Sequence, residues 1–531
     1  MNSGSDPVTS LIKNSYRNLV NSRRYALGFY LAGGLLLAIV ATSLERIGLS
    51  HKVLIIGAAL LVFPLNWIFY WLATLLRQTD SVRTETMESG EVEVSSVASA
   101  SIAEPDRTNE LSGEREGRAI HPSSEQRGLV AIDFGSSKTR VLVAEITEEA
   151  ICYRAHGVAE SRGSHNGVIT DFDKAGVSIR RVVEAAEDMA GVPIKNATVS
   201  IGGRHVQGFN SRGEISFGAR SREIGMKEIR QAVDKARIVP LPADREILHL
   251  LPQEFILDDQ PGVQDPIGMM ATRLEVRVHI VTASSIATQN LVTAVNRAGV
   301  HVDDTIFGPL ACADSVLRSD ERELGVCLVD LGAGSCDLVV FQQGAVVHTA
   351  VIPIGGDHFT SDISVGMCTG LADAEMLKKN FGNAVPTLIP EGNEVEVPSV
   401  GDRPPRMMPQ RMVGEILEPR ARELFELLRD NLRHAGVLEH CIGGFVLSGG
   451  GSRLPGILDV AESVLRKAAR LAWPKPLAKM PSFLAKPEFA TVLGLTYYRD
   501  RASRARGLPE LLARSRSADL APLWKGRFGS S

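Results

Sequence analysis

The chain has 531 residues, 44% of them hydrophobic and 23% charged, with a formal net charge of −4 at pH 7. This length leaves room for roughly two to four domains, and the mildly acidic balance argues against a protein that binds nucleic acid over its whole surface. The six cysteines include no Cys-x-x-Cys pair. Their scattered positions favour buried thiols over a zinc site or a disulfide framework.

Two long stretches without charged residues, 25–44 and 53–76, follow a polar segment at 1–24. At about 1.5 Å per helical residue, each stretch reaches the roughly 30 Å of a bilayer core. A cleaved signal peptide is the alternative for the first stretch. The second stretch and the lack of a small-residue cleavage site argue against it. We therefore expect a transmembrane helical hairpin over residues 25–76.

The basic residues near these stretches predict their orientation. Four basic residues precede the first stretch, and Arg77 and Arg83 follow the second. The connector carries only Arg46 and Lys52, partly offset by Glu45. Because positively charged flanks stay on the cytoplasmic side, we expect both ends of the hairpin in the cytoplasm and the protein in the cytoplasmic (inner) membrane.

Two segments have compositions that predict no packed hydrophobic core. Residues 77–127 are rich in Ser, Thr, Glu, Val and Ala, and such a segment cannot bury enough apolar surface to offset its ordering entropy. We interpret it as a disordered linker. Residues 501–531 are Arg-rich and contain Pro509 and Pro522, which predicts a flexible tail rather than one continuous helix. Weak lipid contact by residues 520–528 is an additional hypothesis.

The folded part opens with two apolar, β-branched runs that predict strands around a short turn, over residues 129–145. A turn of Gly and Ser lets the backbone approach an anion closely. A carboxylate at the end of the first strand can hold Mg²⁺, directly or through water. A plain hairpin is the alternative for this stretch alone. The candidate phosphate-binding residues are Asp133, Gly135, Ser136, Ser137 and Lys138.

The pattern of strand, Asp, Gly-rich turn and strand recurs at residues 326–340. A strand at 444–448 then runs into three glycines and a helix. The two Asp turns resemble internal repeats that could clamp a nucleoside triphosphate and Mg²⁺ between two lobes, while the glycines pack against the nucleoside. The P-loop pattern is absent. The additional candidates are Asp330, Gly332, Gly334, Ser335, Gly449, Gly450, Gly451 and Arg453.

Hydrophobic periodicity predicts several further elements between these motifs. We expect a helix ending near Gly191, a strand at 197–201, a helix at 284–299 and a long helix at 412–434 that contains Pro419. Residues 205–283 have a mixed pattern and are interpreted as an inserted subdomain. Within it we expect a helix at 226–238 and strands at 254–258 and 272–282.

This set of motifs resembles the superfamily of actin, the heat-shock chaperone ATPases and the sugar kinases, and within it the FtsA family of bacterial division proteins. The resemblance covers residues 128–498 and includes the stretches 260–268, 320–326, 394–406 and 418–420. It implies an α/β, actin-like (ribonuclease H-like) two-lobed fold. The implied segments are lobe 1 at 128–204 and 284–324, an FtsA-type subdomain at 205–283, lobe 2 at 325–356 and 443–500, and a lobe 2 subdomain at 357–442.

The resemblance also assigns roles to residues. Gly355 and Gly356 lie at the first connecting segment, and Glu375 and Lys378 contact the nucleoside, with a solvated ion pair as the alternative for the last two. Asp133 and Asp330 are implied to hold Mg²⁺. Arg420 is implied to bind the acidic C-terminal peptide of FtsZ, the tubulin-like ring protein.

The implied function is an ATP-binding, polymerising membrane adaptor that tethers the FtsZ ring and recruits other division proteins at the septum. A PilM-like ATP-binding scaffold and a sugar-kinase-type phosphotransferase are the alternatives. Two departures from the family stand out. Typical members lack N-terminal spans and end in an amphipathic membrane helix. Where relatives place a water-positioning Gln or Glu, this chain has Ala287 and Thr288, with Gln289 nearest, so we expect at most slow ATP hydrolysis and assign no catalytic residue.

Overall fold

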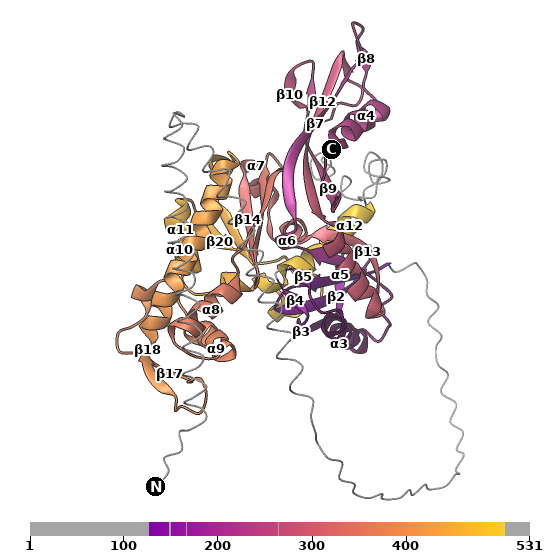
Figure 1. Ribbon diagram of the computed structural model, residues 1–531. Coiled ribbons are helices and arrows are strands. Elements are labelled where there is room, and N and C mark those ends of the chain that lie inside the picture. The colour runs from indigo at the N-terminus through magenta and orange to yellow at the C-terminus, as the bar shows by residue number, and fades with distance from the viewer. Residues whose placement is uncertain (1–126, 148–149, 166, 264, 505–531) are drawn as a thin grey trace, which may run out of the picture. The chain divides into compact units, whose positions relative to one another are not determined.

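The computed structural model describes residues 127–147, 150–165, 167–263 and 265–504 (Figure 1). The stretches predicted to span the membrane, the predicted linker and the tail beyond residue 504 lie outside the described residues. Among the helices that are described, none combines the length and apolar character needed to cross a bilayer.

Lobe 1 is built on a mixed five-stranded sheet in the order β13-β6-β1-β2-β3. β1 pairs antiparallel with β2 and parallel with β6, which in turn lies parallel to β13. Alternate residues face opposite sides, so Ile132 packs against α3 and Ala131 packs against α12. The strands are β1 (Arg127–Phe134), β2 (Lys138–Ile146), β3 (Ile151–Glu160), β6 (Asn196–Ile201) and β13 (His301–Phe307).

Helices cover both faces of this sheet. The α3 helix begins where the Asp171 side chain accepts hydrogen bonds from the first backbone amides, and it ends at Gly191, which has a φ of 70°. α5 packs beside α3, and α6 and α12 pack together at the other face. The helices are α3 (Phe172–Ala190), α5 (Ser285–Arg297), α6 (Gly308–Val316) and α12 (Ala490–Arg504).

Lobe 2 repeats the sheet of lobe 1. Its order, β16-β15-β14-β19-β20, has the same sequence of antiparallel and parallel pairings as β3-β2-β1-β6-β13. Asp133 and Asp330 therefore lie at equivalent places, near the ends of β1 and β14. The strands are β14 (Val326–Leu331), β15 (Cys336–Gln342), β16 (Ala345–Ile352), β19 (Phe445–Ser448) and β20 (Ala469–Leu471).

The remainder of lobe 2 is mainly helical. The α10 helix continues through Pro419 and buries one apolar stripe, including Leu417, Leu424 and Phe425, against α8 and α11. The elements are α8 (Gly356–Gly366), α9 (Leu371–Phe381), β17 (Glu394–Val397), β18 (Arg406–Pro409), α10 (Gln410–His434) and α11 (Ile457–Leu465).

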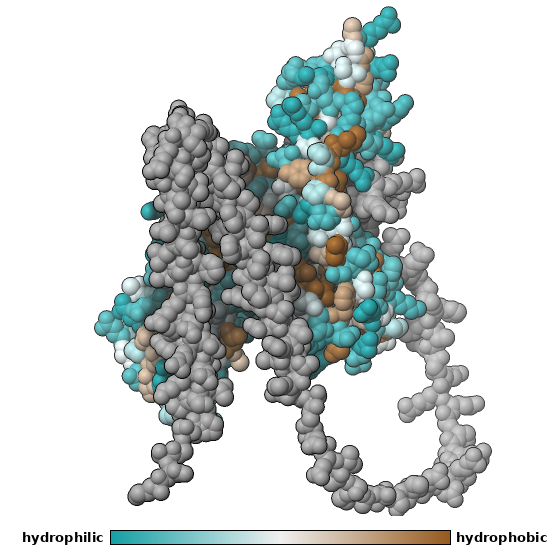
Figure 2. All heavy atoms as spheres, viewed as in Figure 1, coloured by the Kyte–Doolittle hydropathy of each residue, from teal (hydrophilic) through white to brown (hydrophobic). Residues whose placement is uncertain are grey.

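The inserted subdomain is a four-stranded antiparallel sheet, β10-β9-β12-β7, with α4 packed on one face (Figure 1). Mostly hydrophilic residues cover its free end on the face shown in Figure 2. Its elements are β7 (Gln207–Ser216), β8 (Arg222–Glu223), α4 (Met226–Arg237), β9 (Arg245–Leu257), β10 (Gln260–Val263), β11 (Met270–Ala271) and β12 (Arg273–Ser284).

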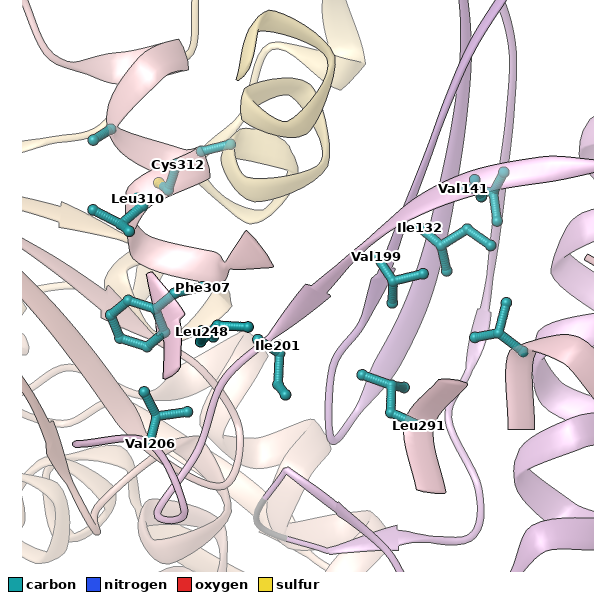
Figure 3. Close-up of a cluster of buried hydrophobic side chains, with 14 of the residues drawn as sticks. Ile132, Val141, Val199, Ile201, Val206, Leu248, Leu291, Phe307, Leu310 and Cys312 are labelled. Atoms are coloured by element: carbon teal, nitrogen blue, oxygen red, sulfur yellow. The ribbon is translucent and has the colours of Figure 1, made fainter. Parts of the chain in front are cut away.

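At its base, the subdomain shares a core with lobe 1. Figure 3 shows Leu248 of β9 and the neighbouring Val206 around Phe307, in the same apolar cluster as Ile201 of β6. Short elements complete the chain: β4 (Ser164–His165), β5 (Val168–Ile169), α7 (Ser319–Leu324), and 3₁₀ turns at Pro386–Leu388, Leu438–His440, Gly450–Arg453, Ser482–Leu484 and Pro487–Phe489.

Three features differ from the sequence predictions. β9 begins at Arg245, well before the strand predicted at 254–258, because its residues 248–251 are buried as a continuous run without alternation. α8 was not predicted at all. The predicted lobe 2 segment 443–500 also contains most of α12, which packs against β1, β2 and α6 of lobe 1.

Candidate functional site

A cavity of about 470 Å³ lies between the two lobes and brings the sequence-predicted motifs together. The Gly turn before β2, the Gly turn before β15 and the turn after β19 all contribute to its wall. Among the described residues, the lining includes every predicted nucleotide-binding residue except Gly355: Asp133, Gly135, Ser136, Ser137, Lys138, Asp330, Gly332, Gly334, Ser335, Gly356, Glu375, Lys378, Gly449, Gly450, Gly451 and Arg453.

The first wall is the turn between β1 and β2. The Asp133 carboxylate accepts a hydrogen bond of 2.7 Å from the Ser200 hydroxyl, and its other oxygen lies 3.4 Å from Nη1 of Arg140. The hairpin register places Arg140 directly opposite Asp133. The Arg140 guanidinium also lies 5.4 Å from the centre of the Phe489 ring. This wall therefore combines the Asp133 carboxylate and the Arg140 guanidinium with the hydroxyls of Ser136, Ser137 and Ser200 and the Lys138 side chain.

The second wall is the turn between β14 and β15. The Thr491 hydroxyl donates to Asp330 at 3.0 Å. Asp337, which the sequence reading missed, accepts hydrogen bonds of 2.9 Å from the Gly203 amide and the Ser335 hydroxyl. Burial and the nearby Asp133 and Asp337 carboxylates raise the pKa of Asp330 to about 7, and burial raises the pKa of Asp337 to about 6. Burial thus disfavours the charged form of both carboxyls at this wall.

Two glycines allow the turns to pack closely. Gly449 has a φ of +79°, and a Cβ there would lie 2.4 Å from the Leu331 carbonyl oxygen. A Cβ on Gly355 would lie 2.3 Å from the Ala333 carbonyl oxygen. Gly355 therefore packs against the backbone of the second turn, while Gly356 lines the cavity itself.

Glu375 and Lys378 form a partly buried ion pair at the cavity wall. The Lys378 ammonium lies 2.6 Å from Glu375 and donates to the Gly356 carbonyl at 2.8 Å and to the Thr360 hydroxyl at 2.7 Å. Burial favours a raised pKa for Glu375, but hydrogen bonds from Lys378 and Thr360 outweigh it and lower the pKa. The pair therefore ties α9 to the first turn of α8 and also faces the cavity.

Two predicted residues lie elsewhere. Arg420 is on α10, where its guanidinium contacts both oxygens of Asp362 at 2.6 and 2.9 Å and also pairs with Glu423. Gln289 is exposed on α5, and its side chain contacts Thr293 of the same helix. No glutamine is among the described residues that line the cavity. The cavity lining therefore combines positively charged side chains with carboxylates, Glu375 and Glu488 among them.

Comparisons with known proteins identify the family. Residues 327–494 match the model described as "Cell division protein FtsA", and residues 203–282 match the "SHS2 domain inserted in FTSA". The cell division protein FtsA of Pseudomonas aeruginosa is 40% identical over 371 residues, covering 70% of this chain and 88% of the relative. The chain belongs to the FtsA family. The FtsA of Borreliella burgdorferi is 36% identical over 403 residues, covering 75% of this chain and 98% of the relative.

Family membership confirms the predicted FtsA-type, actin-like fold and its role as a division protein. The SHS2 match coincides with the inserted sheet of β7 to β12. A solved PilM–PilN type IV pilus biogenesis complex has a similar fold, with a TM-score of 0.50 and 17% identity over 69% of this chain and 97% of the other. Because that identity is low, the likeness concerns the fold alone, and the FtsA relatives decide between the two families.

Proposed function

We propose that this FtsA-family protein binds ATP between its lobes and thereby favours its own assembly into filaments, which tether the FtsZ ring to the cytoplasmic membrane and recruit other division proteins. The observation that carries the proposal is the convergence of three turns, far apart in the sequence, on one cavity. Two of these turns come from equivalent positions in the repeated sheets.

The cavity residues divide into three groups by their chemistry. The backbone amides of the Gly turns and the hydroxyls of Ser136, Ser137 and Ser335 suit phosphate oxygens. Lys138 and Lys378 add positive charge, and Gly449–Gly451 offer bare backbone to a flat nucleoside.

The carboxylates of Asp133 and Asp330 fit Mg²⁺, directly or through water, because hard oxygen ligands suit this ion. Burial, and after it the nearby Asp133 and Asp337 carboxylates, raises the pKa of Asp330. A bound Mg²⁺ would supply positive charge that offsets both the carboxylates and the phosphates. Asp337 lies near enough to Asp330 to add to the same field.

We also propose that the FtsZ C-terminal peptide binds beside Arg420. Arg420 lies at a partly exposed site on α10 and is held by the carboxylate of Asp362 on α8. An acidic peptide can exchange with Asp362 as the partner of this guanidinium, because bidentate Arg–carboxylate pairs are interchangeable in geometry.

Titration of an FtsZ tail peptide into the full chain, with and without ATP, tests this adaptor role. We expect Arg420→Glu to weaken peptide binding at least tenfold, since it replaces attraction by repulsion. Arg433→Glu is the matched control, because Arg433 is exposed on the same helix, about three and a half turns away, and pairs with Asp430. Equal binding by both variants would remove Arg420 from the interface, and no binding by the wild type would contradict the adaptor role.

Membrane attachment is proposed to rest on residues 25–44 and 53–76, which lie outside the described residues. Deleting residues 1–76 is expected to move the protein from the membrane pellet to the supernatant, because two apolar spans are effectively irreversible anchors. Deleting residues 505–531 is the control and is expected to leave the protein in the pellet. The opposite pattern would make the C-terminal tail the anchor.

A further inference from the structure

Glu488 lines the cavity but has no place among the motifs recognised in the sequence. It lies in the 3₁₀ turn Pro487–Phe489, directly before α12, and its side chain is 15% exposed. One carboxylate oxygen accepts a hydrogen bond of 2.7 Å from Nη1 of Arg453. The other oxygen, Oε2, is shielded from solvent and has no hydrogen-bond partner within the described part of the chain.

The backbone around Glu488 is held firmly against the triple-glycine turn. The carbonyl of Pro487 accepts hydrogen bonds from the Gly449 amide at 3.3 Å and from the Ser448 hydroxyl at 3.2 Å. Arg453, which belongs to the same turn, fixes the first carboxylate oxygen. The unpartnered oxygen is therefore positioned by its surroundings, and its place is beside the glycines that suit a nucleoside.

A buried acceptor without a donor is uncommon and unfavourable, so such a group points to a missing partner. A triphosphate offers no donor at neutral pH, and its negative charge repels a carboxylate. A nucleoside offers sugar hydroxyls and, in adenine, an exocyclic amino group. The partner that matches Glu488 chemically is thus the nucleoside end of the ligand, with the phosphates towards the two Asp turns.

We propose that Glu488 is a specificity-determining residue that accepts a hydrogen bond from the nucleoside. This inference rests on the proposed binding of ATP in the same cavity. The last torsion of a glutamate side chain is broad, so a small rotation presents the free oxygen to the ligand while Arg453 keeps the other. The donor is either a ribose hydroxyl or the adenine amino group, and the experiment separates the two.

The test is competition against a fluorescent ATP analogue on the full chain with Mg²⁺. The competitors are ATP, 2′-deoxy-ATP, 3′-deoxy-ATP and ITP, which lacks the 6-amino group. Wild type is expected to bind one of the three analogues about tenfold or more weakly than ATP, because removing the donor leaves Glu488 unsatisfied. The discrimination ratio is the dissociation constant of that analogue divided by the dissociation constant of ATP. In Glu488→Ala this ratio is expected to fall close to one.

Two controls make the outcome decisive. Glu439→Gln changes a carboxylate that pairs with Lys467 away from the cavity, and its ratio is expected to stay at the wild-type value. Inorganic tripolyphosphate lacks a nucleoside and is expected to bind Glu488→Ala at least as tightly as wild type. If Glu488→Ala fails to bind tripolyphosphate, Glu488→Gln replaces it, and its ratio is expected to fall below the wild-type ratio.

If the Glu488 variant that still binds tripolyphosphate discriminates against the analogue as strongly as wild type does, the role of Glu488 is overturned. The proposed binding of ATP is unaffected by that result. Equal binding of ATP and all three analogues by wild type would also overturn the role of Glu488. Failure of the wild type to bind any nucleoside triphosphate would instead overturn the proposed function. The two failures are therefore distinguishable.

Discussion

The cavity between the lobes and the base of the inserted subdomain both bury polar side chains where lobe 2 meets another part of the molecule, but with opposite results. At the base of the subdomain, His279 of β12 is fully buried, and its two ring nitrogens contact Asn210 at 2.7 Å and Thr349 at 2.9 Å. The Gln253 side chain of β9 donates to the carbonyl of Val346 on β16 at 2.9 Å. These hydrogen bonds join the subdomain to lobe 2, and both ring nitrogens of His279 have a partner.

The cavity shows the contrary arrangement. Burial, and after it the nearby Asp133 and Asp337 carboxylates, raises the pKa of Asp330, and one oxygen of Glu488 has no partner among the described residues. Satisfied polar networks fix a structure, whereas unsatisfied charge in a cavity reduces stability and is retained for a ligand. The comparison therefore favours a structural role for the first region, and the second is where we propose that a ligand binds.

The largest effect is expected from His279→Ala at the subdomain base. The substitution leaves a cavity and removes the ring nitrogens that contact Asn210 and Thr349, so we expect a loss of about 3–5 kcal/mol in the free energy of unfolding. Urea unfolding of the full chain, followed by pulse proteolysis, measures it. The control is His301→Ala, an exposed histidine, with an expected change within about 0.5 kcal/mol. Similar values for both variants would refute a structural network at this site.

Asp330→Asn in the cavity is expected to raise the free energy of unfolding, whereas His279→Ala lowers it. It removes a buried carboxylate whose ionisation is disfavoured, so we expect the protein without nucleotide to gain about 1–3 kcal/mol at pH 8. Binding of ATP with Mg²⁺ is expected to weaken at least tenfold. The measurements are thermal unfolding without ligand and the shift in melting temperature on adding ATP. Asp402→Asn, in an exposed loop, is the control. A destabilised variant with unchanged ATP binding would contradict both expectations.

The same contrast shows what the sequence can and cannot predict. The three turns were predictable because each is a local pattern of strand, acid and glycine, and the repeat of the first two indicated a shared fold. Arg140 could also have been predicted to line the cavity. It follows Lys138 by two residues, so both side chains lie on the same face of the strand.

Asp337 was predictable by the same reasoning, because it lies opposite Asp330 as Arg140 lies opposite Asp133, whereas Ser200 and Thr491 were not. Thr491 contacts Asp330 across 161 residues of sequence, and Ser200 contacts Asp133 across 67. Such contacts come from the packing of α12 and β6 against the cavity, which no local pattern specifies. The base of the subdomain was missed for the same reason, because His279 is separated from Thr349 by 70 residues.

The smallest expected effect is the pH dependence of the free energy of unfolding that comes from buried histidines at the subdomain base. Burial, with a smaller effect of nearby His348, lowers the pKa of His279 to about 3, and burial with the Arg245 charge lowers that of His205 to about 4. Both values lie below the ordinary 6.5, so between about pH 6.5 and 4 the unfolded chain binds protons that the folded chain does not. The free energy of unfolding should therefore fall as the pH drops from 6.5, by about 1–2 kcal/mol per histidine at pH 5.

Urea titrations at pH 6.5 and 5.0 test this by difference, because the other titrating groups are shared by wild type and variant. In His279→Gln we expect the loss of stability between the two pH values to shrink by about 1–2 kcal/mol, since the contribution of His279 is gone. His301→Gln should show the wild-type loss. If His279→Gln also shows the wild-type loss of stability, His279 titrates in the folded protein as it does in the unfolded chain. The hydrogen bonds at the subdomain base would then not keep His279 neutral.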